Sequence, residues 1–178
     1  NAGEPVNFNW TSSATKSDSL LKMRFTIATL FIAALAVSAV TASAETMMPY
    51  SGTQSVTTGQ PFGAFLEGLK AAIQKNKMGL VSEASTTKGA AKIGKTIAGN
   101  HVLMIFRPDF AVCMLEASVA SGVEAPLRLY VTEGADGNAT LTYRLPSHVF
   151  AAYDVPALDE MAKELDATFA AIVADATM

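Results

Sequence analysis

The chain of 178 residues has a single cysteine, Cys113, and few charged side chains. One cysteine excludes an intramolecular disulfide and a zinc site built from several thiolates, because both need at least two thiols. The absence of a C-x-x-C-H sequence excludes covalent haem attachment. Lysine and arginine number 13 against 16 acidic residues, and the formal net charge is −3. The sequence has no polybasic stretch of the kind that binds nucleic acid, so we do not expect a nucleic-acid partner.

Apolar residues, in contrast, make up half of the chain, and the mean hydropathy is +0.28. A chain with this composition and so little net charge is not expected to be disordered. A folded part of this size forms one domain around one core.

The region around Met23 has the order of a secretory signal peptide. Lys22 and Arg24 flank Met23. They are followed by residues 25–40, which carry no charge, and by small residues up to Ala44. This order predicts cleavage between Ala44 and Glu45. The alternative, a retained membrane helix, needs roughly 20 apolar residues and a basic cluster after them, and both are missing. We therefore expect a periplasmic or secreted protein that has no membrane segment after cleavage.

The segment 1–22 precedes Met23 and is rich in Ser, Thr and Asn. We interpret it as upstream or cloning-derived sequence and expect it to be disordered. The chain is then divided into the segment 1–22, the signal peptide 23–44 and a single folded domain 45–178.

The spacing of apolar residues in this domain predicts two long amphipathic helices. One begins at Pro61, and the other follows Asp154 and Pro156. Their expected core positions are Phe62, Phe65, Leu66, Leu69 and Ile73 in the first, and Leu158, Met161, Leu165, Phe169 and Ile172 in the second. A shorter helix is expected over 109–119, capped by Asp109 and burying Cys113.

Five strands are expected, over residues 50–58, 79–83, 102–106, 127–132 and 140–145. The uninterrupted apolar run Val102–Phe106 indicates a strand covered on both faces or nearly so. The last two strands alternate apolar and polar residues around an Asp136-Gly137 turn, which predicts an antiparallel hairpin. The order β-α-β-β-β-β-α predicts a two-layer α+β domain with helices packed on one face of a mainly antiparallel sheet.

Several spaced motifs resemble those of the domain-of-unknown-function family number 302, over about residues 50–176. They are Pro61-Phe62 before Leu69-Lys70-x-x-Ile73, Phe106-Arg107-Pro108, Ala125 to Val131 ahead of Asp136-Gly137, and Tyr143-x-x-Pro146. The resemblance implies a fold like that of the TATA-box-binding protein, without DNA binding, and a homodimer. Many members carry a cysteine where this chain has Arg107. The family has no agreed activity, so the resemblance supplies no catalytic residue.

Residues 89–96 match the phosphate-loop pattern G-x-x-x-x-G-K-[ST]. This loop needs a buried strand before it and a long helix after it, so that backbone N–H groups meet the phosphates. Here Gly99-Asn100 follow too soon for such a helix. We interpret Lys88, Lys92 and Lys95 as the solvated face of a short helical turn.

Three arginines are the main candidates for a binding site. Arg107, Arg128 and Arg144 lie on or just beyond apolar strands, and we expect them to share one side of the sheet. A set of guanidinium groups suits a small anionic ligand bearing a carboxylate or a phosphate. The alternatives are a dimer contact or ion pairs with surface acids. His101, before the third strand, is a further ligand-binding candidate, although a hydrogen-bonded structural role is the more common one for such a residue.

A soft-metal site is an alternative interpretation. It would combine Cys113 or His101 with Met104, Met114 or the Met47-Met48 pair, because thiolates and thioethers favour Cu(I). No Met-x-x-Met or His-x-His spacing supports it. We predict an exported module that binds a ligand or self-assembles, with no cofactor, no metal and no catalytic residue. A periplasmic copper or redox accessory protein and an enzyme of unknown reaction remain as alternatives.

Overall fold

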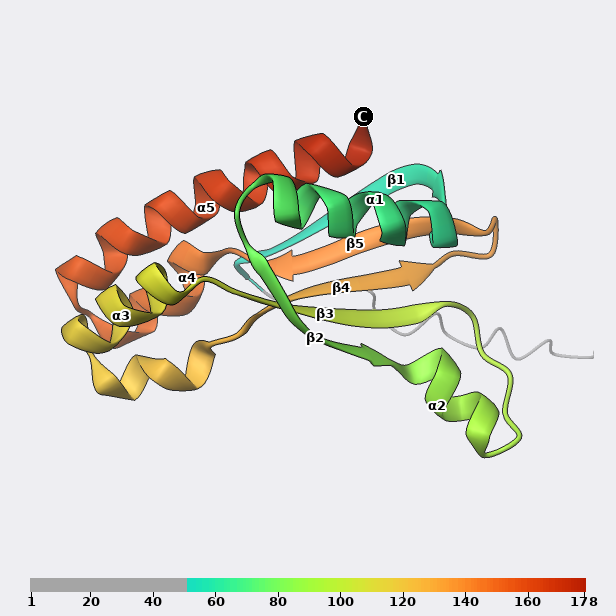
Figure 1. Ribbon diagram of the computed structural model, residues 1–178, viewed down its shortest axis with the longest axis horizontal. Coiled ribbons are helices and arrows are strands. Elements are labelled where there is room, and N and C mark those ends of the chain that lie inside the picture. The colour runs from blue at the N-terminus through green and yellow to red at the C-terminus, as the bar shows by residue number, and fades with distance from the viewer. Residues whose placement is uncertain (1–50) are drawn as a thin grey trace, which may run out of the picture. The chain divides into compact units, whose positions relative to one another are not determined.

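The computed structural model describes residues 51–178, so the expectations for the segments 1–22 and 23–44 lie outside the described residues. Within them, one antiparallel sheet has the strand order β1-β5-β4-β3-β2 (Figure 1). Its strands are β1 Thr53–Pro61, β2 Gly79–Ser85, β3 Asn100–Phe106, β4 Leu127–Glu133 and β5 Asn138–Arg144.

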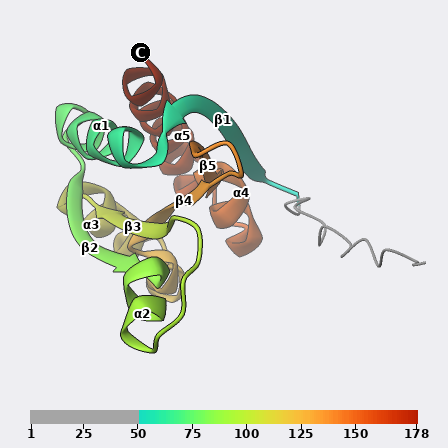
Figure 2. The same ribbon diagram turned by 90° about the vertical axis from the view of Figure 1, so that its right-hand side faces the viewer.

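The helices are α1 Phe62–Lys75, α2 Thr86–Lys92, α3 Pro108–Ala117, α4 Pro146–Phe150 and α5 Pro156–Thr177, with 3-10 turns at Val119–Glu124 and Ala151–Tyr153. The helices α1 and α5 pack on one face of this sheet, α3 and α4 lie beyond one of its ends, and α2 projects away from it (Figures 1 and 2). The long helices α1 and α5 contact each other above the sheet. The predicted α+β class and the antiparallel sheet are confirmed.

The core lies between the sheet and the pair α1–α5. Every second residue of β3, β4 and β5 points toward the helices, as strand geometry requires, and is buried. The predicted apolar faces of α1 and α5 meet them, for example where the Phe169 ring lies 5.4 Å from that of Tyr143. The remaining strand residues, among them Arg128, Tyr130 and Arg144, lie on the opposite face, over which none of the described helices packs (Figure 2) and which we call the open face.

The expectation for β3 was wrong in one respect. His101, Leu103 and Ile105 are buried, whereas Val102 and Met104 between them are partly exposed on the open face. Within residues 51–178, helices therefore cover this strand on one face only. An unbroken run of apolar residues predicts a strand, but it does not show whether one face or both faces of that strand are buried.

Helix α3 also differs from the prediction. It begins at Pro108, and its N-cap residue is Arg107 rather than Asp109, which lies inside the first turn. Proline suits the first helical position because its missing N–H has no partner there. Cys113 is exposed, contrary to the prediction, because α3 packs at the end of the sheet and buries only Met114.

The predicted hairpin joins β4 to β5. Gly137 has φ +78°, and the Asp136 carboxylate accepts the backbone N–H of Asn138 at 3.0 Å. This turn fixes which residues of β4 and β5 lie opposite each other.

In residues 51–178 we find no helix with the length and apolar character needed to cross a bilayer.

Candidate functional site

Arg128 and Arg144 lie opposite each other on the open face. The β4–β5 register pairs Leu129 with Tyr143, and the next residue outward on each strand is an arginine. Leu129 and Tyr143 point to the helices, so both arginines point the other way. The expectation that these two arginines share one side of the sheet is therefore correct.

Both arginines line a cavity of about 40 Å³, together with Glu124, Leu127 and Val149. By the usual volume of 10–15 Å³ for one water, such a cavity has room for about three water-sized groups. This is the size of a carboxylate or of the oxygens on one side of a phosphate. We refer to it as the arginine cavity.

The electrostatics of the arginine cavity are unbalanced. Among residues 51–178, neither Arg128 nor Arg144 has a carboxylate within ion-pair distance. Like charges directly opposite each other on neighbouring strands are destabilising. An anion between the two guanidinium groups would replace this repulsion by two attractions.

Arg144 carries the clearest sign of a missing partner. Its Nε is buried and has no hydrogen-bond acceptor among the described residues. A buried donor without an acceptor costs about 1–3 kcal/mol. The orphan N–H is therefore suited to a ligand oxygen.

Glu124, the acidic residue in the cavity lining, is engaged elsewhere. Its carboxylate accepts the Tyr153 hydroxyl at 3.0 Å. Desolvation and this carboxylate together raise the pKa of Tyr153 above its ordinary value, which keeps the hydroxyl protonated as a donor. Glu124 lines the cavity, but within residues 51–178 it forms neither a hydrogen bond nor an ion pair with Arg128 or Arg144.

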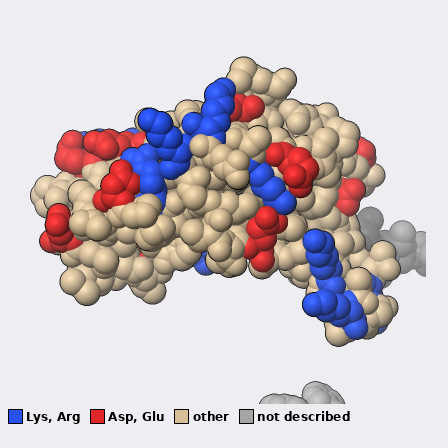
Figure 3. Space-filling model, in the orientation of Figure 1, with Lys and Arg blue, Asp and Glu red and all other residues tan. Residues whose placement is uncertain are grey.

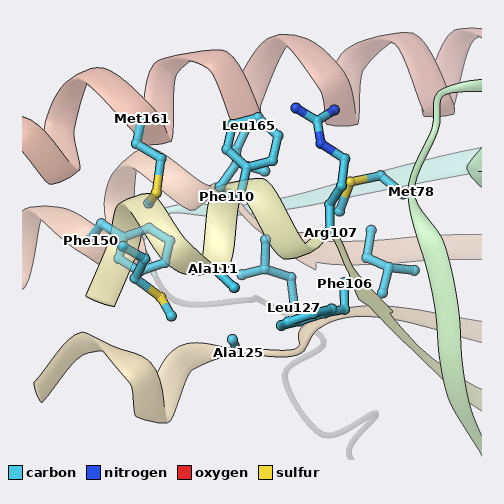
Figure 4. A pocket seen from close by; sticks show the side chains of 12 residues that line it. Met78, Phe106, Arg107, Phe110, Ala111, Ala125, Leu127, Phe150, Met161 and Leu165 are labelled. Atoms are coloured by element: carbon cyan, nitrogen blue, oxygen red, sulfur yellow. The ribbon is translucent and has the colours of Figure 1, made fainter. Parts of the chain in front are cut away.

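Arg107 does not join the other two, and the prediction of a three-arginine face was wrong. It follows β3 in step with Leu103 and Ile105 and therefore lies on the helix side of the sheet. Its Nε donates to Asp109 at 2.8 Å, and its guanidinium stands 3.9 Å from the centre of the Phe110 ring (Figure 4). The alternation within β3 would have shown this, had the strand been taken as covered on one face.

Arg107 lines a second cavity, of about 30 Å³, between β3, α3 and α5. Its walls are mostly apolar and include Met78, Met114 and Met161. Met78 and Met161 lie at opposite ends of this cavity (Figure 4). The sulfur atoms therefore do not converge on one point.

His101 belongs to a third, separate group. It is 8% exposed on the helix side of β3, and its Nε2 donates to Glu83 Oε2 at 2.8 Å. The same oxygen lies 3.2 Å from Nζ of Lys70 on α1. Burial pushes the pKa of Glu83 up, but the hydrogen bonds from His101 and Lys70 outweigh it, so the pKa lies below its ordinary value. His101 thus has a structural partner and lies across the sheet from the arginine cavity.

Sequence reasoning missed Glu83. The expected strand 79–83 ended at this residue, so it carried no assignment to a face. The observed β2 extends to Ser85, and Glu83 pairs with Leu103 on the helix side. A charged residue beside the buried face of a strand needs partners, and Lys70 and His101 supply them.

The proposed soft-metal ligands are dispersed. Cys113 is exposed on α3, Met104 is on the open face, and His101 is on the helix side of the sheet. Residues 51–178 contain no group of three or more His, Cys, Asp or Glu side chains that could hold a metal ion. Met47 and Met48 lie outside the described residues.

Residues 89–96, which match the phosphate-loop pattern, do not form such a loop. Gly89 lies within the short helix α2, and the residues after Lys92 form an irregular loop rather than a long helix. Lys88, Lys92 and Lys95 are exposed. This agrees with their interpretation as a solvated face.

The five-stranded antiparallel sheet with its helical layer defines a class, the two-layer α+β domains. Comparison with known families then places the chain: the model of the family described as "Domain of unknown function DUF302" matches residues 54–176, and the chain belongs to this family. The crystal structure of an uncharacterized conserved DUF302 protein from Bacillus stearothermophilus has a TM-score of 0.64 at 19% identity. It covers 71% of this chain and 98% of its own. At this identity the likeness supports the fold. A comparison with curated proteins finds no match.

Proposed function

We propose that this chain is an exported, non-enzymatic module that binds a small anion, a carboxylate or a phosphate group, between Arg128 and Arg144. The observation that carries the proposal is the buried Nε of Arg144, which has no acceptor in the described part of the chain and faces the like charge of Arg128 across the strand pair. Charge-assisted hydrogen bonds from two guanidinium groups give an anion both affinity and a fixed orientation.

The test is a calorimetric titration of the protein with sodium phosphate or sodium acetate, against sodium chloride at matched ionic strength. We expect saturable binding of at least one of the two anions and none of chloride. Which anion binds distinguishes a phosphate ligand from a carboxylate ligand.

Three variants locate the site. Arg128→Gln and Arg144→Gln are each expected to weaken binding at least tenfold, because a hydrogen bond to a charged group contributes about 1.5–3 kcal/mol. Arg107→Gln is the matched control, since it removes the same charge from the helix side of the sheet. It should leave the affinity within about twofold of the wild type, on the scale where tenfold is 1.4 kcal/mol. Equal losses in all three variants, or no anion-specific binding, would contradict the proposal.

A further inference from the structure

Residues 86–98 form a basic arm that projects from the domain. Helix α2 and the loop after it stand away from the sheet and the other helices (Figures 1 and 2). The arm carries Lys88, Lys92 and Lys95, and no acidic residue occurs between Glu83 and Asp109. Figure 3 shows these positive side chains gathered on the projection. On a chain of net charge −3, this is a local reversal of sign.

Two large apolar side chains accompany these lysines. Ile93 is 75% exposed and Ile97 is 40% exposed. Both lie in the loop after α2, which turns at Gly94 with φ +70°. Neither packs against the core cluster of the domain. The arm therefore presents apolar and positively charged side chains on the same projection.

The base of the arm is held by specific hydrogen bonds. The Thr87 hydroxyl donates to the carbonyl of Ala98 at 3.1 Å and accepts the backbone N–H of Asn100 at 2.8 Å. The N–H of Gly99 donates to Glu133 at 2.6 Å. These bonds tie both ends of the arm to β3 and β4. These bonds fix the position of the arm, and Ile93 and Ile97 on it remain exposed to solvent.

We infer that the arm docks on an anionic lipid bilayer. In this arrangement Ile93 and Ile97 enter the interface between headgroups and acyl chains, while the lysines lie among the phosphates. Surface-binding segments combine these two kinds of side chain, because apolar burial and attraction to anionic lipid add. The inference concerns a different part of the domain from the arginine cavity and does not depend on it.

Charge and size favour a bilayer over other anionic partners. A nucleic acid would attract the lysines but would leave both isoleucines in water, and the arm has no aromatic or arginine side chain on which a base could stack. A stable protein interface takes about 800 Å² from each partner, more than a few side chains on one projection offer. A bilayer requires no such complementary surface.

Docking of this kind needs no spanning helix. It departs from the expectation that the processed chain has no contact with a membrane, which considered only segments that cross the bilayer. Three lysines and two isoleucines give reversible binding, since each lysine near an anionic surface improves partition by about fivefold. We therefore expect binding that depends on salt as well as on lipid charge.

Co-sedimentation with vesicles tests the inference, using protein as isolated from cells with its N-terminus established by intact mass. The vesicles contain phosphatidylcholine alone or with a third of phosphatidylglycerol. We expect binding to the anionic vesicles only, and its loss as salt is raised toward 1 M, where the Debye length is about 3 Å.

Matched variants assign this binding to the arm. Lys88→Gln with Lys92→Gln and Lys95→Gln should weaken it at least tenfold, and Ile93→Ser with Ile97→Ser should weaken it several-fold, by the lysine and apolar contributions given above. The control replaces three other exposed lysines by glutamine (Lys75, Lys77 and Lys163) and should stay within about twofold. Equal losses in the arm and control variants, binding to neutral vesicles alone, or preference for an oligonucleotide over anionic vesicles would overturn the inference.

Discussion

At the scale of single residues, the opposed pair Arg128 and Arg144 has the largest consequences. They occupy opposite positions on β4 and β5, where like charges repel, and neither forms an ion pair with a carboxylate of the described residues. We therefore expect the pair to lower the stability of the sheet when no anion is bound. A bound anion would then contribute to the free energy of binding in two ways, by attracting both guanidinium groups and by screening the repulsion between them.

This repulsion leads to an unusual expectation for a mutant. In dilute chloride buffer, Arg128→Gln should raise the free energy of unfolding by about 0.2–1 kcal/mol, because it removes a like-charge pair from neighbouring strands. Urea unfolding of both proteins measures the difference. In 1 M salt, where such charges are screened, the gain should disappear. A variant less stable than the wild type at low salt would show that Arg128 already has a favourable partner.

Glu83 provides a second test at this scale. Despite its desolvation, its hydrogen bonds with His101 and Lys70 hold its folded pKa below the ordinary value of 4.5. A carboxyl whose pKa is depressed by folding contributes stability at pH values above 4.5 and loses it as the pH falls through the folded pKa. Glu83→Gln should cost about 1 kcal/mol at pH 7, since the group is partly solvated.

The acid limb of the stability curve then distinguishes this role. Between pH 7 and pH 3, the variant should lose less stability than the wild type. Glu116→Gln, on exposed helix surface, should follow the wild-type curve. Parallel acid curves for Glu83→Gln and the wild type, measured by denaturant unfolding, would contradict the assignment.

At the scale of secondary-structure elements, the long helix α5 lines the core with one of its faces. Its apolar face is buried along the whole helix, from Leu158 to Ala176. Leu165→Ala should lower the free energy of unfolding by about 2–5 kcal/mol, because truncation of a buried leucine leaves a cavity in the core. Leu115→Ala, on α3, is the matched control: Leu115 is 45% exposed, whereas Leu165 is 2% exposed. The control should cost less than about 1 kcal/mol, and equal costs would show that Leu165 is not part of the core.

The basic arm is an element whose order depends on a few bonds. Thr87→Val removes the hydroxyl that holds Ala98 and Asn100. We expect faster amide hydrogen exchange over residues 88–98, with β4 and β5 unchanged, because local opening does not require global unfolding. NMR measurement of the amide exchange rate at each residue tests this expectation. Unchanged protection of the arm would mean that other contacts hold it.

The elements also show what can be predicted from such a sequence. The apolar faces of α1 and α5 and the β4–β5 hairpin were predictable, because each has a clear period and a turn or proline at its boundary. The coverage of β3 was not, since an apolar run has no period to assign its faces. The error at Arg107 followed from this, because Arg107 continues the alternation of β3. The error at Cys113 has another cause, because its exposure depends on where α3 packs, which tertiary contacts decide.

Of the candidate site, the sequence predicted a shared face for Arg107, Arg128 and Arg144, which holds for Arg128 and Arg144, and the anion-binding chemistry of guanidinium groups; that Arg128 and Arg144 lie opposite each other came only with the register. It did not predict that His101 has a carboxylate partner, because Glu83 and Lys70 come from other elements and meet it only in the folded domain. Residue type can suggest a ligand. The register and the layers of the fold decide which side chains reach it.

At the scale of the whole molecule, the open face is the surface that helices leave uncovered in the described domain. We expect a homodimer, as the family resemblance implies. Native mass spectrometry of the isolated protein, with and without phosphate, would count subunits and bound anions in one measurement. A monomer at all concentrations would contradict the dimer without affecting the arginine cavity.

The central claim is that an anion binds at the orphan N–H of Arg144. NMR spectroscopy of the arginine Nε–Hε resonances during a titration with inorganic phosphate, at constant ionic strength, tests it most directly. The account predicts that the Arg144 resonance shifts and saturates, that Arg107 stays unchanged, and that Arg128→Gln weakens the response at least tenfold, as expected for loss of one charged hydrogen bond. An Arg144 resonance that does not move, or that moves without saturating, would contradict the account.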